Sequence, residues 1–340
     1  MLRLGRATGD DATNLRIAVF PDDPWGSGHY RIIWPAHALL AMGLPISIGH
    51  VSSSRPENES SIVDACREIE ADVVVLQRPL SKQIADLVLL LQEKGIAVVI
   101  DNDDHVATIS PLNEYYALAR PDLSPSRNWI HLARACQQAD FITVSTPALA
   151  GPPYFNHRRY RVIPNYVPNR ILVMGNLETI EYSKPTLGWT GVVATHPHDL
   201  EEAREGILAV VPKYYRLAVV GIGDGLRERL GLSFPIPSTG WLDTEVYLRA
   251  TSRLDVGIVP LAQSAFNSAK SWLKGLEFAS LGIPFVASPT PSYELLHRLG
   301  AGLLAATPSD WMRLLRQLVT DHDLQERVRS SGYHAAEAHN

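Results

Sequence analysis

Short apolar runs alternate with longer amphipathic stretches along most of the chain. This pattern is typical of parallel sheets covered by helices on both faces. In the first half we predict strands at residues 15–20, 45–49, 72–77, 97–101, 141–145 and 161–163, and helices at 29–42, 60–70, 82–94 and 126–138. In the second half we predict strands at 186–190, 216–221, 237–241, 255–259 and 284–287, and helices at 199–211, 244–251, 269–281, 292–299, 309–319 and 322–339. The fold class is therefore α/β.

The 340 residues are enough to bury two hydrophobic cores. A turn-rich stretch at residues 164–169, Pro-Asn-Tyr-Val-Pro-Asn, separates the two halves. We therefore predict an N-terminal domain at 1–168, a C-terminal domain at 169–320 and a terminal helix within 321–340.

Composition narrows the function classes only slightly. A hydrophobic content of 46% and a charged content of 20% are typical of a soluble globular protein, and a net charge of −5 disfavours a nonspecific nucleic-acid binder. Cys66 and Cys136 lie in predicted helices and form no disulfide framework. The first sixteen residues contain no secretory signal, and no apolar run is long enough to span a bilayer. These features predict a cytoplasmic protein without a transmembrane segment.

One segment, residues 260–288, places charged residues on a helix between two buried strands. The predicted helix at 269–281 carries Lys270, Lys274 and Glu277. Seven residues span nearly two helical turns, so Lys270 and Glu277 share a face about 10 Å apart along the axis, roughly the reach of a nucleoside diphosphate. The N–H groups at the helix start and a lysine ammonium group can bind phosphates, and a carboxylate can accept hydrogen bonds from ribose hydroxyls. The alternative is a solvated helix face in which Lys274 and Glu277 form an ion pair.

The order of parts in this segment resembles the donor-binding stretch of the group 1 family of retaining glycosyltransferases. In that family a strand ending in Pro-Leu leads to a loop, a helix with a ribose-binding glutamate, and a Gly-x-Pro stretch. The matching residues here are Pro260-Leu261, Glu277 and the run from Gly282 to Ser288. The resemblance implies the GT-B fold, in which two Rossmann-like doubly wound domains face each other across a cleft. It also implies that the acceptor binds the N-terminal domain, that the nucleotide sugar binds the C-terminal domain, and that the terminal helix packs back toward the first domain.

The chain departs from this family at the position of the usual first glutamate, which is Ala269 here. The surrounding sequence reads Phe-Asn-Ser-Ala-Lys-Ser, like a subgroup with Asn and Lys in this loop. The departure leaves the sugar contact of the missing glutamate without a counterpart at this position. The resemblance implies that Glu277 binds the ribose and that Lys270 is a catalytic contact to the leaving phosphate, with Asn267 and Ser271 as further donor contacts.

Ligands of open parallel sheets bind beyond the carboxyl ends of the strands, so the loops after the predicted strands are candidate site walls. The loop at residues 21–30 contains Gly26 and Gly28, which allow a ligand to approach the backbone closely, and Arg31 lies at the start of the next helix. The loop looks like the family's glycine loop, which faces the donor phosphate and the acceptor. Gly28 and Arg31 are therefore donor-site candidates. An ordinary strand-to-helix turn is the alternative.

A second candidate wall is residues 101–105, Asp-Asn-Asp-Asp-His, directly after a buried strand. Such side chains can bind a divalent cation, hydrogen-bond sugar hydroxyls or steer an acceptor proton. The resemblance favours the sugar contact, because GT-B enzymes generally need no catalytic metal, and it makes His105 the counterpart of a donor-contacting histidine. Asp104 and His105 are therefore catalytic candidates, with a polar capping loop as the alternative. We expect Asp103 and Asp104 to point in different directions and not to form a dyad.

Two glycine-containing loops follow strands of the second half. Residues 188–200 read Gly-Trp-Thr-Gly and then Thr-His-Pro-His-Asp-Leu, similar to the family's loop toward the donor pyrophosphate. We predict Gly191 and His196 in the donor site, and Asp199 as the N-cap of the following helix. Residues 221–225, Gly-Ile-Gly-Asp-Gly, are expected near the nucleotide base.

These residues predict a retaining, metal-independent glycosyltransferase without a cofactor. It would move a sugar from a nucleoside-diphosphate sugar to an acceptor hydroxyl on a glycan, a small molecule, a protein or modified DNA, with the developing charge on the diphosphate stabilised by cations and backbone N–H groups. Three alternatives stay open. One is a sugar-nucleotide epimerase, and another is a catalytically silent binding protein, which Ala269 favours. The third is a transferase acting on modified DNA, for which residues 157–161, His-Arg-Arg-Tyr-Arg, form a small basic patch.

Overall fold

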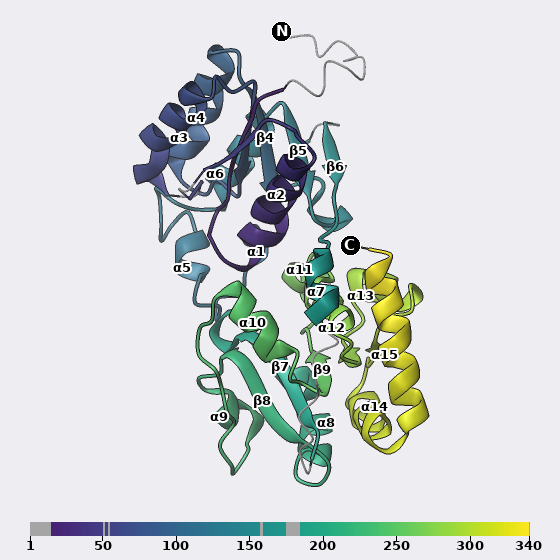
Figure 1. The fold of residues 1–340 in the computed structure, drawn as a ribbon. Coiled ribbons are helices and arrows are strands. Elements are labelled where there is room, and N and C mark those ends of the chain that lie inside the picture. Colours follow the sequence, from purple (N-terminus) through teal and green to yellow (C-terminus); the bar gives the residue numbers. More distant parts are fainter. Residues whose placement is uncertain (1–14, 50–51, 54, 157–158, 175–183, 340) are drawn as a thin grey trace. The chain divides into compact units, whose positions relative to one another are not determined.

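The computed structural model describes residues 15–49, 52–53, 55–156, 159–174 and 184–339. The chain divides into two compact units, whose elements are labelled in Figure 1. The first unit comprises Met1–Ile109 and Tyr115–Asn165, and the second comprises Ser110–Glu114 and Tyr166–Asn340. The division after Asn165 falls inside the turn-rich stretch that separates the two halves of the sequence.

The first unit is built on a parallel sheet of six strands in the order β2-β1-β3-β4-β5-β6. Its central strands are almost continuously apolar, and Val74, Leu76, Val98 and Ile100 are fully buried, as expected where helices cover both faces. All the strands predicted for this half are confirmed, with ends that shift by one or two residues. They are β1 (Ile17–Phe20), β2 (Ile46–Ile48), β3 (Val73–Gln77), β4 (Ala97–Asn102), β5 (Phe141–Val144) and β6 (Tyr160–Val162).

The helices of the first unit begin at polar capping residues where the sequence offers them. Ser81 accepts a hydrogen bond from the backbone N–H of Ile84, and Asn128 accepts one from Ile130. The helix predicted at 29–42 is interrupted, because a π-helical turn at His29–Ile33 precedes its regular part. The helices are α1 (Gly26–Gly28), α2 (Trp34–Ala41), α3 (Glu59–Glu68), α4 (Lys82–Glu93), α5 (Tyr116–Ala119) and α6 (Trp129–Gln138).

The second unit is built on a parallel sheet of five strands in the order β11-β10-β9-β7-β8. The strands are β7 (Thr186–Val192), β8 (Arg216–Ile222), β9 (Val256–Val259), β10 (Phe285–Ala287) and β11 (Leu303–Leu304). The strand predicted at 237–241 is wrong, because this segment forms only an isolated bridge between Ser238 and Val219. Pro235 and Pro237 lack the N–H groups that a ladder needs, and Gly240 has a φ of 73°, so the pairing cannot extend.

The helices of the second unit pack around this sheet, and one of them, α12, supports the candidate site. Helix α12 contacts β9 and β10 on one side and α15 on another. Gly275 allows α12 to pack closely against Tyr293 and Phe285, because a Cβ there would lie 2.7 Å from the first ring and 3.0 Å from the second. The helices are α7 (Asn169–Met174), α8 (Arg204–Val210), α9 (Leu226–Leu230), α10 (Thr244–Thr251), α11 (Ala265–Ser268), α12 (Leu273–Ser280), α13 (Pro291–Arg298), α14 (Pro308–Thr320) and α15 (His322–Glu337).

Each sheet has one place where the order of strands reverses. From β1 the chain forms β2 on one side and then β3 on the other, and from β7 it forms β8 on one side and then β9 on the other. In open parallel sheets, ligands bind outside the carboxyl ends of strands at such a reversal. The loops after β1 and β3, and those after β7 and β9, are therefore the places to search. Among the described residues, no helix is both long and apolar enough to cross a membrane.

Candidate functional site

In the second unit, the loops after β7 and β9 are joined through the buried side chain of Asp199. Its Oδ1 accepts hydrogen bonds from the backbone N–H of Ala262 at 2.9 Å and from Asn267 Nδ2 at 2.6 Å, and its Oδ2 lies 2.8 Å from His196 Nδ1. Burial opposes ionisation, but these hydrogen bonds outweigh it and hold the pKa of Asp199 below its usual value. Asp199 therefore links the two loops at the strand reversal.

This arrangement corrects the predicted role of Asp199 and shows how Asn267 is held. Asp199 makes no side-chain cap, and the helix predicted at 199–211 starts as a 3₁₀ turn at Leu200–Ala203 before α8. Asn267 is 5% exposed, and its Nδ2 donates both to Asp199 and to the carbonyl of Ala262. Because the amide N–H groups are engaged inside the loop, Asn267 shapes the loop and does not offer them to a donor.

Lys274 is the cation at the carboxyl end of β7. Its Nζ lies 4.6 Å from the ring centroid of Trp189, which is 1% exposed. Among the described residues, none accepts a hydrogen bond from this ammonium group or pairs with it, so the ion pair with Glu277 that the sequence left open is absent. Burial, and then repulsion from Lys270, lowers the pKa of Lys274 to about 8. The two lysines thus create a positive region that an anion would stabilise.

Gly191 brings the end of β7 close to this lysine. Its φ of +130° is unfavourable for other residues, and a Cβ at this position would lie 3.2 Å from the Trp189 ring and 3.4 Å from Lys274 Nζ. A Cβ at Gly221, after β8, would lie 2.0 Å from the carbonyl oxygen of Gly191. Glycine is therefore required at both strand ends for the backbone to pack so tightly beside Lys274.

Lys270 does not lie on the predicted helix. Of the stretch predicted as one helix at 269–281, only α12, which begins at Leu273, is helical. The short helix α11, which Ser264 caps by accepting from the N–H of Asn267, ends before this stretch. Lys270 and Ser271 lie in the connection between α11 and α12, so Lys270 and Glu277 do not share a helix, and the helix start lies two residues after Ser271. The Nζ of Lys270 lies 4.3 Å from the Phe266 ring centroid.

Glu277 is 5% exposed and is held by a residue that the sequence did not indicate. The hydroxyl of Tyr247, on α10, donates to Glu277 Oε2 at 2.8 Å. Burial, and then the charge of Glu277, raises the pKa of Tyr247 well above its usual value, so the hydroxyl remains a donor. No sequence signal connects these residues, which lie thirty positions apart on different helices.

His196 is neutral in this unit. Its ring packs edge-on against Trp189 with centroids 5.3 Å apart. Burial, and then the charge of Lys274, lowers the pKa of His196 to about 4 despite the contact with Asp199. Because the carboxylate of Asp199 can only accept, Nδ1 carries the proton and Nε2 is the acceptor of the ring. His196 therefore lies near Lys274 as a neutral group, and its place in a donor site stays a prediction.

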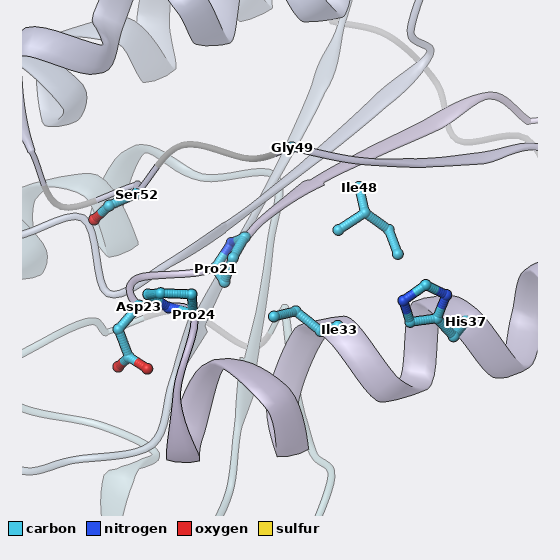
Figure 2. Close-up of a pocket in the computed structure, with 8 residues that line it drawn as sticks. All are labelled: Pro21, Asp23, Pro24, Ile33, His37, Ile48, Gly49 and Ser52. Carbon is cyan, nitrogen blue, oxygen red and sulfur yellow. The ribbon is translucent and has the colours of Figure 1, made fainter. Parts of the chain in front are cut away.

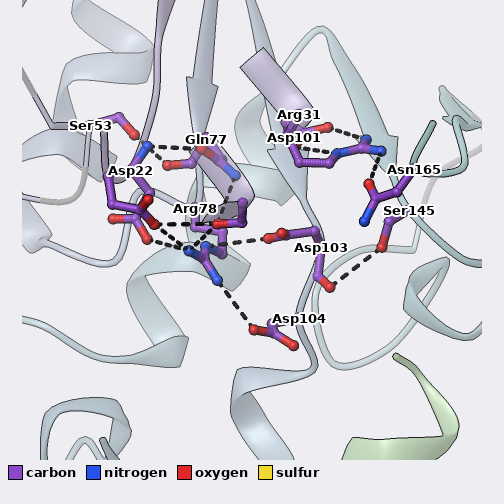
Figure 3. A network of polar contacts seen from close by, with 12 residues as sticks. Asp22, Arg31, Ser53, Gln77, Arg78, Asp101, Asp103, Asp104, Ser145 and Asn165 are labelled. Atoms are coloured by element: carbon purple, nitrogen blue, oxygen red, sulfur yellow. Dashed lines mark hydrogen bonds and ion pairs between the residues drawn. The ribbon is translucent and has the colours of Figure 1, made fainter. Parts of the chain in front are cut away.

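The first unit has a charged cluster at the carboxyl ends of β1, β3 and β4 (Figure 3). The guanidinium of Arg78 lies 2.7 Å from Asp22, 3.3 Å from Asp23, 3.3 Å from Asp103 and 3.2 Å from Asp104. Arg78 has a φ of 43°, an uncommon conformation outside glycine. Burial, against the attraction of Arg78, raises the pKa of Asp103 to about 7. Asp103 and Asp104 thus meet at one cation, contrary to the expectation that they point apart.

Arg31 and Gly28 have structural roles in the first unit. Arg31 is 9% exposed, and its guanidinium donates to both carboxylate oxygens of Asp101, at 3.0 and 2.6 Å, and to Asn165 Oδ1 at 3.0 Å. A buried guanidinium with these partners is engaged inside the unit, so the structure does not support the predicted donor contact of Arg31. A Cβ on Gly28 would lie 1.8 Å from the carbonyl oxygen of Asp23, so this glycine accommodates its own loop rather than a ligand.

His105 lies next to this cluster in the sequence but contacts other groups. Its Nδ1 lies 2.9 Å from Thr108 Oγ1, and its ring packs edge-on against Tyr154 with centroids 5.4 Å apart. Burial lowers its pKa, so the ring is neutral at pH 7. Asp104 and His105 therefore belong to the first unit, whereas Lys270, Lys274 and Glu277 belong to the second.

The first unit also contains a cavity of about 300 Å³ (Figure 2). Its walls come from the loops after β1 and β2 and from the first helical stretch, and they are largely apolar. The lining residues are Pro21, Asp23, Pro24, Ile33, His37, Ile48, Gly49 and Ser52. This volume is at the lower end of small-molecule pockets. In the described part of the chain, no three His, Cys, Asp or Glu side chains are placed to hold a metal ion.

Comparisons with known proteins identify the architecture. No family model matches the sequence, and no curated protein matches it either. Solved structures do match along almost its whole length. The sucrose-phosphate synthase of Thermosynechococcus elongatus has a TM-score of 0.66 at 13% identity, covering 96% of this chain and 95% of that chain. The chain has the GT-B fold.

Two other GT-B structures illustrate the breadth of the likeness. Anabaena HepE, solved with UDP-glucose, has a TM-score of 0.63 at 12% identity and covers 96% of this chain and 95% of its own. An alpha-glucosyltransferase solved with UDP and DNA containing an HMU base has a TM-score of 0.60 at 15% identity, covering 96% of both chains. At such identities the GT-B likeness confirms the predicted fold, whereas the activity has to be argued from the site.

Proposed function

We propose that this chain is a glycosyltransferase that uses a nucleoside-diphosphate sugar, and that the donor binds at the strand reversal of the second unit. The observation that carries this proposal is Lys274. Its ammonium group is largely buried against Trp189, next to a second lysine, and no carboxylate of the described residues lies within ion-pair distance of it, although Asp199 and Glu277 attract it from further away. A buried cation with only distant counter-charges is costly, and a diphosphate at the carboxyl ends of β7 and β9 would supply a direct partner.

The rest of the site suits the other parts of such a donor. Glu277 provides a buried carboxylate for the ribose hydroxyls, and it lies on the same helix as Lys274, three residues further along. Gly191 allows the β7 backbone to approach the diphosphate closely. Asp199 holds the loops after β7 and β9 together through Ala262, so the two walls keep a fixed separation. These contacts support a rigid nucleotide site built on strand and helix ends.

In the proposed reaction, the bond between the anomeric carbon and the β-phosphate oxygen breaks, and its electron pair stays with the diphosphate. A new bond forms from the anomeric carbon to the acceptor oxygen, and the acceptor proton passes to the leaving diphosphate. Lys274 and Lys270 would stabilise the charge that develops on the leaving group, the largest single effect in many enzymes. We propose that the enzyme retains the anomeric configuration and needs neither a catalytic metal nor a cofactor.

Two of the similar structures support the choice of the first donor to test. HepE was solved with UDP-glucose, and the alpha-glucosyltransferase was solved with UDP. Uridine is therefore the base to test first. The DNA in the second structure keeps modified DNA among the acceptors to test, together with glycans, small molecules and proteins. Of the basic stretch at 157–161, His157 and Arg158 lie outside the described residues.

The test is release of the nucleoside diphosphate from UDP-glucose, UDP-N-acetylglucosamine and the GDP, ADP and dTDP sugars, with and without EDTA. Transfer predicts release that depends on an added acceptor, persists in EDTA and yields an α-linked product from an α-linked donor. Formation of an epimeric sugar nucleotide without release would instead identify an epimerase. Binding of a nucleotide with neither reaction in any acceptor mixture would identify a silent binding protein.

A further inference from the structure

The cavity of the first unit lies at the strand reversal of its own sheet, because its loops follow β1 and β2. Ligands of open parallel sheets bind beyond the carboxyl ends of strands at such a reversal. The cavity has a volume of about 300 Å³. An apolar cavity of about 150 Å³ holds one benzene ring, so this volume has room for a bicyclic ring.

Hydrogen bonds hold the two loops of the cavity together. The backbone N–H of Gly49, after β2, donates to the carbonyl of Val19 at 2.8 Å, and that of Ser53 donates to the carbonyl of Pro21 at 2.9 Å. These bonds join residues about thirty positions apart in the sequence. A cavity with walls fixed in this way requires little ordering of the chain when a ligand binds.

The helical wall of the cavity presents a different face from the one that covers the sheet. Ile32 and Ala36 are buried in the core, at 4% and 3% exposed. Ile33 and His37 each follow one of them, lie one helical turn apart and line the cavity, with Ile48 on the opposite wall (Figure 2). The π-helical turn of this stretch ends at Ile33, and such turns are rare and frequent at functional sites.

The polar groups of the cavity differ in what they can offer to a ligand. The carboxylate of Asp23 accepts from the backbone N–H of Trp25 at 2.8 Å and lies 3.3 Å from the guanidinium of Arg78, so its charge is compensated inside the unit. The imidazole of His37 is exposed and can exchange a hydrogen bond with a bound molecule. Apolar walls with one such group suit a ring that carries a hydroxyl.

We propose that this cavity is an additional binding site of the chain, which takes a small molecule with a bicyclic aromatic ring and a hydroxyl group. The ring would pack between Ile33 and Ile48, and the hydroxyl would exchange a hydrogen bond with His37. A monosaccharide would fit less well, because most of its hydroxyls would lose water without gaining a partner on these walls. The inference does not rest on the proposed function, since every group in it belongs to the first unit.

The experiment is calorimetric titration of the full chain with 2-naphthol and with glucose. The wild-type chain should bind one 2-naphthol, at least about tenfold more tightly than glucose. Ile33→Trp should fill the cavity and weaken 2-naphthol about tenfold or more. Leu40→Trp is the matched control, because Leu40 lies on α2, is 39% exposed and does not line the cavity. His37→Ala should weaken 2-naphthol about threefold to tenfold by removing one hydrogen bond.

The contrary outcomes are equally distinct. Absence of 2-naphthol binding to the wild type, or binding no tighter than that of glucose, would overturn the inference. Binding that neither Ile33→Trp nor His37→Ala weakens would place 2-naphthol elsewhere on the surface and would overturn it too. Thermal unfolding shows whether Ile33→Trp is folded, and if it is not, His37→Ala decides alone because that side chain is exposed. Nucleotide binding is measured separately, so failure of this inference leaves the proposed function standing, and the reverse also holds.

Discussion

The ammonium of Lys274 lies 4.6 Å from the centroid of the buried Trp189 ring, at the carboxyl end of β7. A cation over an indole face gains about 0.5–2 kcal/mol, which is less than the cost of burying an unpaired charge. Repulsion from Lys270 adds to this imbalance. Asp199 and Glu277 attract this ammonium group but do not lie within ion-pair distance of it, and an anionic ligand at the place where parallel sheets bind ligands would give it a direct partner.

The first prediction concerns pH. Lys274 is cationic below its pKa of about 8 and neutral above it, and a bound diphosphate would raise that pKa. The affinity for UDP should therefore be greatest below pH 8 and should decline as the pH rises through 8 toward 9.5. Titrations at half-unit steps measure this. In Lys274→Arg the guanidinium remains charged, so the affinity for UDP should no longer fall as the pH rises. If the affinity of this variant still falls, another group causes the pH dependence.

The second prediction uses two neighbouring glycines of the first unit. A Cβ at Gly28 would lie 1.8 Å from the carbonyl oxygen of Asp23, whereas a Cβ at Gly26 would meet nothing within 4 Å. Gly28→Ala should lower the free energy of unfolding by about 2 kcal/mol or more, because the loop backbone must shift. Gly26→Ala should be within about 1 kcal/mol of the wild type. Urea unfolding measures the free energy of unfolding of both variants. Equal values for the two would contradict the packing described around Gly28.

The third prediction concerns the buried carboxyl of Asp103. Its pKa is about 7 in the folded chain and about 4 in an unfolded one, so between these values the folded state holds the proton more tightly. Its contribution to stability therefore falls as the pH rises from about 4 to 7. Asp103→Asn should remove this part of the pH dependence and gain stability relative to the wild type at pH 8.

The matched control for that measurement is Asp64→Asn. Asp64 is exposed and pairs with Arg67 at 3.0 Å on the surface of α3, so its loss should leave the pH profile of unfolding almost unchanged. Urea midpoints at pH 4, 6 and 8 give the profiles. If the urea midpoints of Asp103→Asn depend on pH in the same way as those of the wild type, the raised pKa of this carboxyl is contradicted.

Local patterns in the sequence predicted most of the fold, because short apolar runs, such as residues 97–100 in β4 and all of β9, are typical of strands in a buried parallel sheet. The exceptions have local causes. The predicted strand at 237–241 fails at Pro235 and Pro237, and β11 has only two residues, too few to give a pattern.

The site was harder to predict, because its contacts join residues far apart in the sequence. The sequence predicted Glu277 on a helix and Gly191 and His196 near the end of one strand, where the structure has them, but the partners of Asp199 and Glu277 lie up to 68 and 30 positions away. Arg78 was missed for the same reason, since its four carboxylates follow two other strands. Lys274 entered only the alternative of a solvated helix face, as the ion-pair partner of Glu277, because it stands three residues before that glutamate.

The most direct measurement is titration of UDP, GDP and ADP into the wild-type chain, Lys274→Gln and Lys213→Gln at pH 7. Lys213 is the matched control, since its Nζ also lies over an aromatic ring, 4.9 Å from the centroid of Tyr214, but on the surface of the same unit. The account predicts that one nucleoside diphosphate binds the wild type and Lys213→Gln equally, and that Lys274→Gln binds it about tenfold to a hundredfold more weakly. Equal affinity in all three chains, or no binding to the wild type, would contradict it.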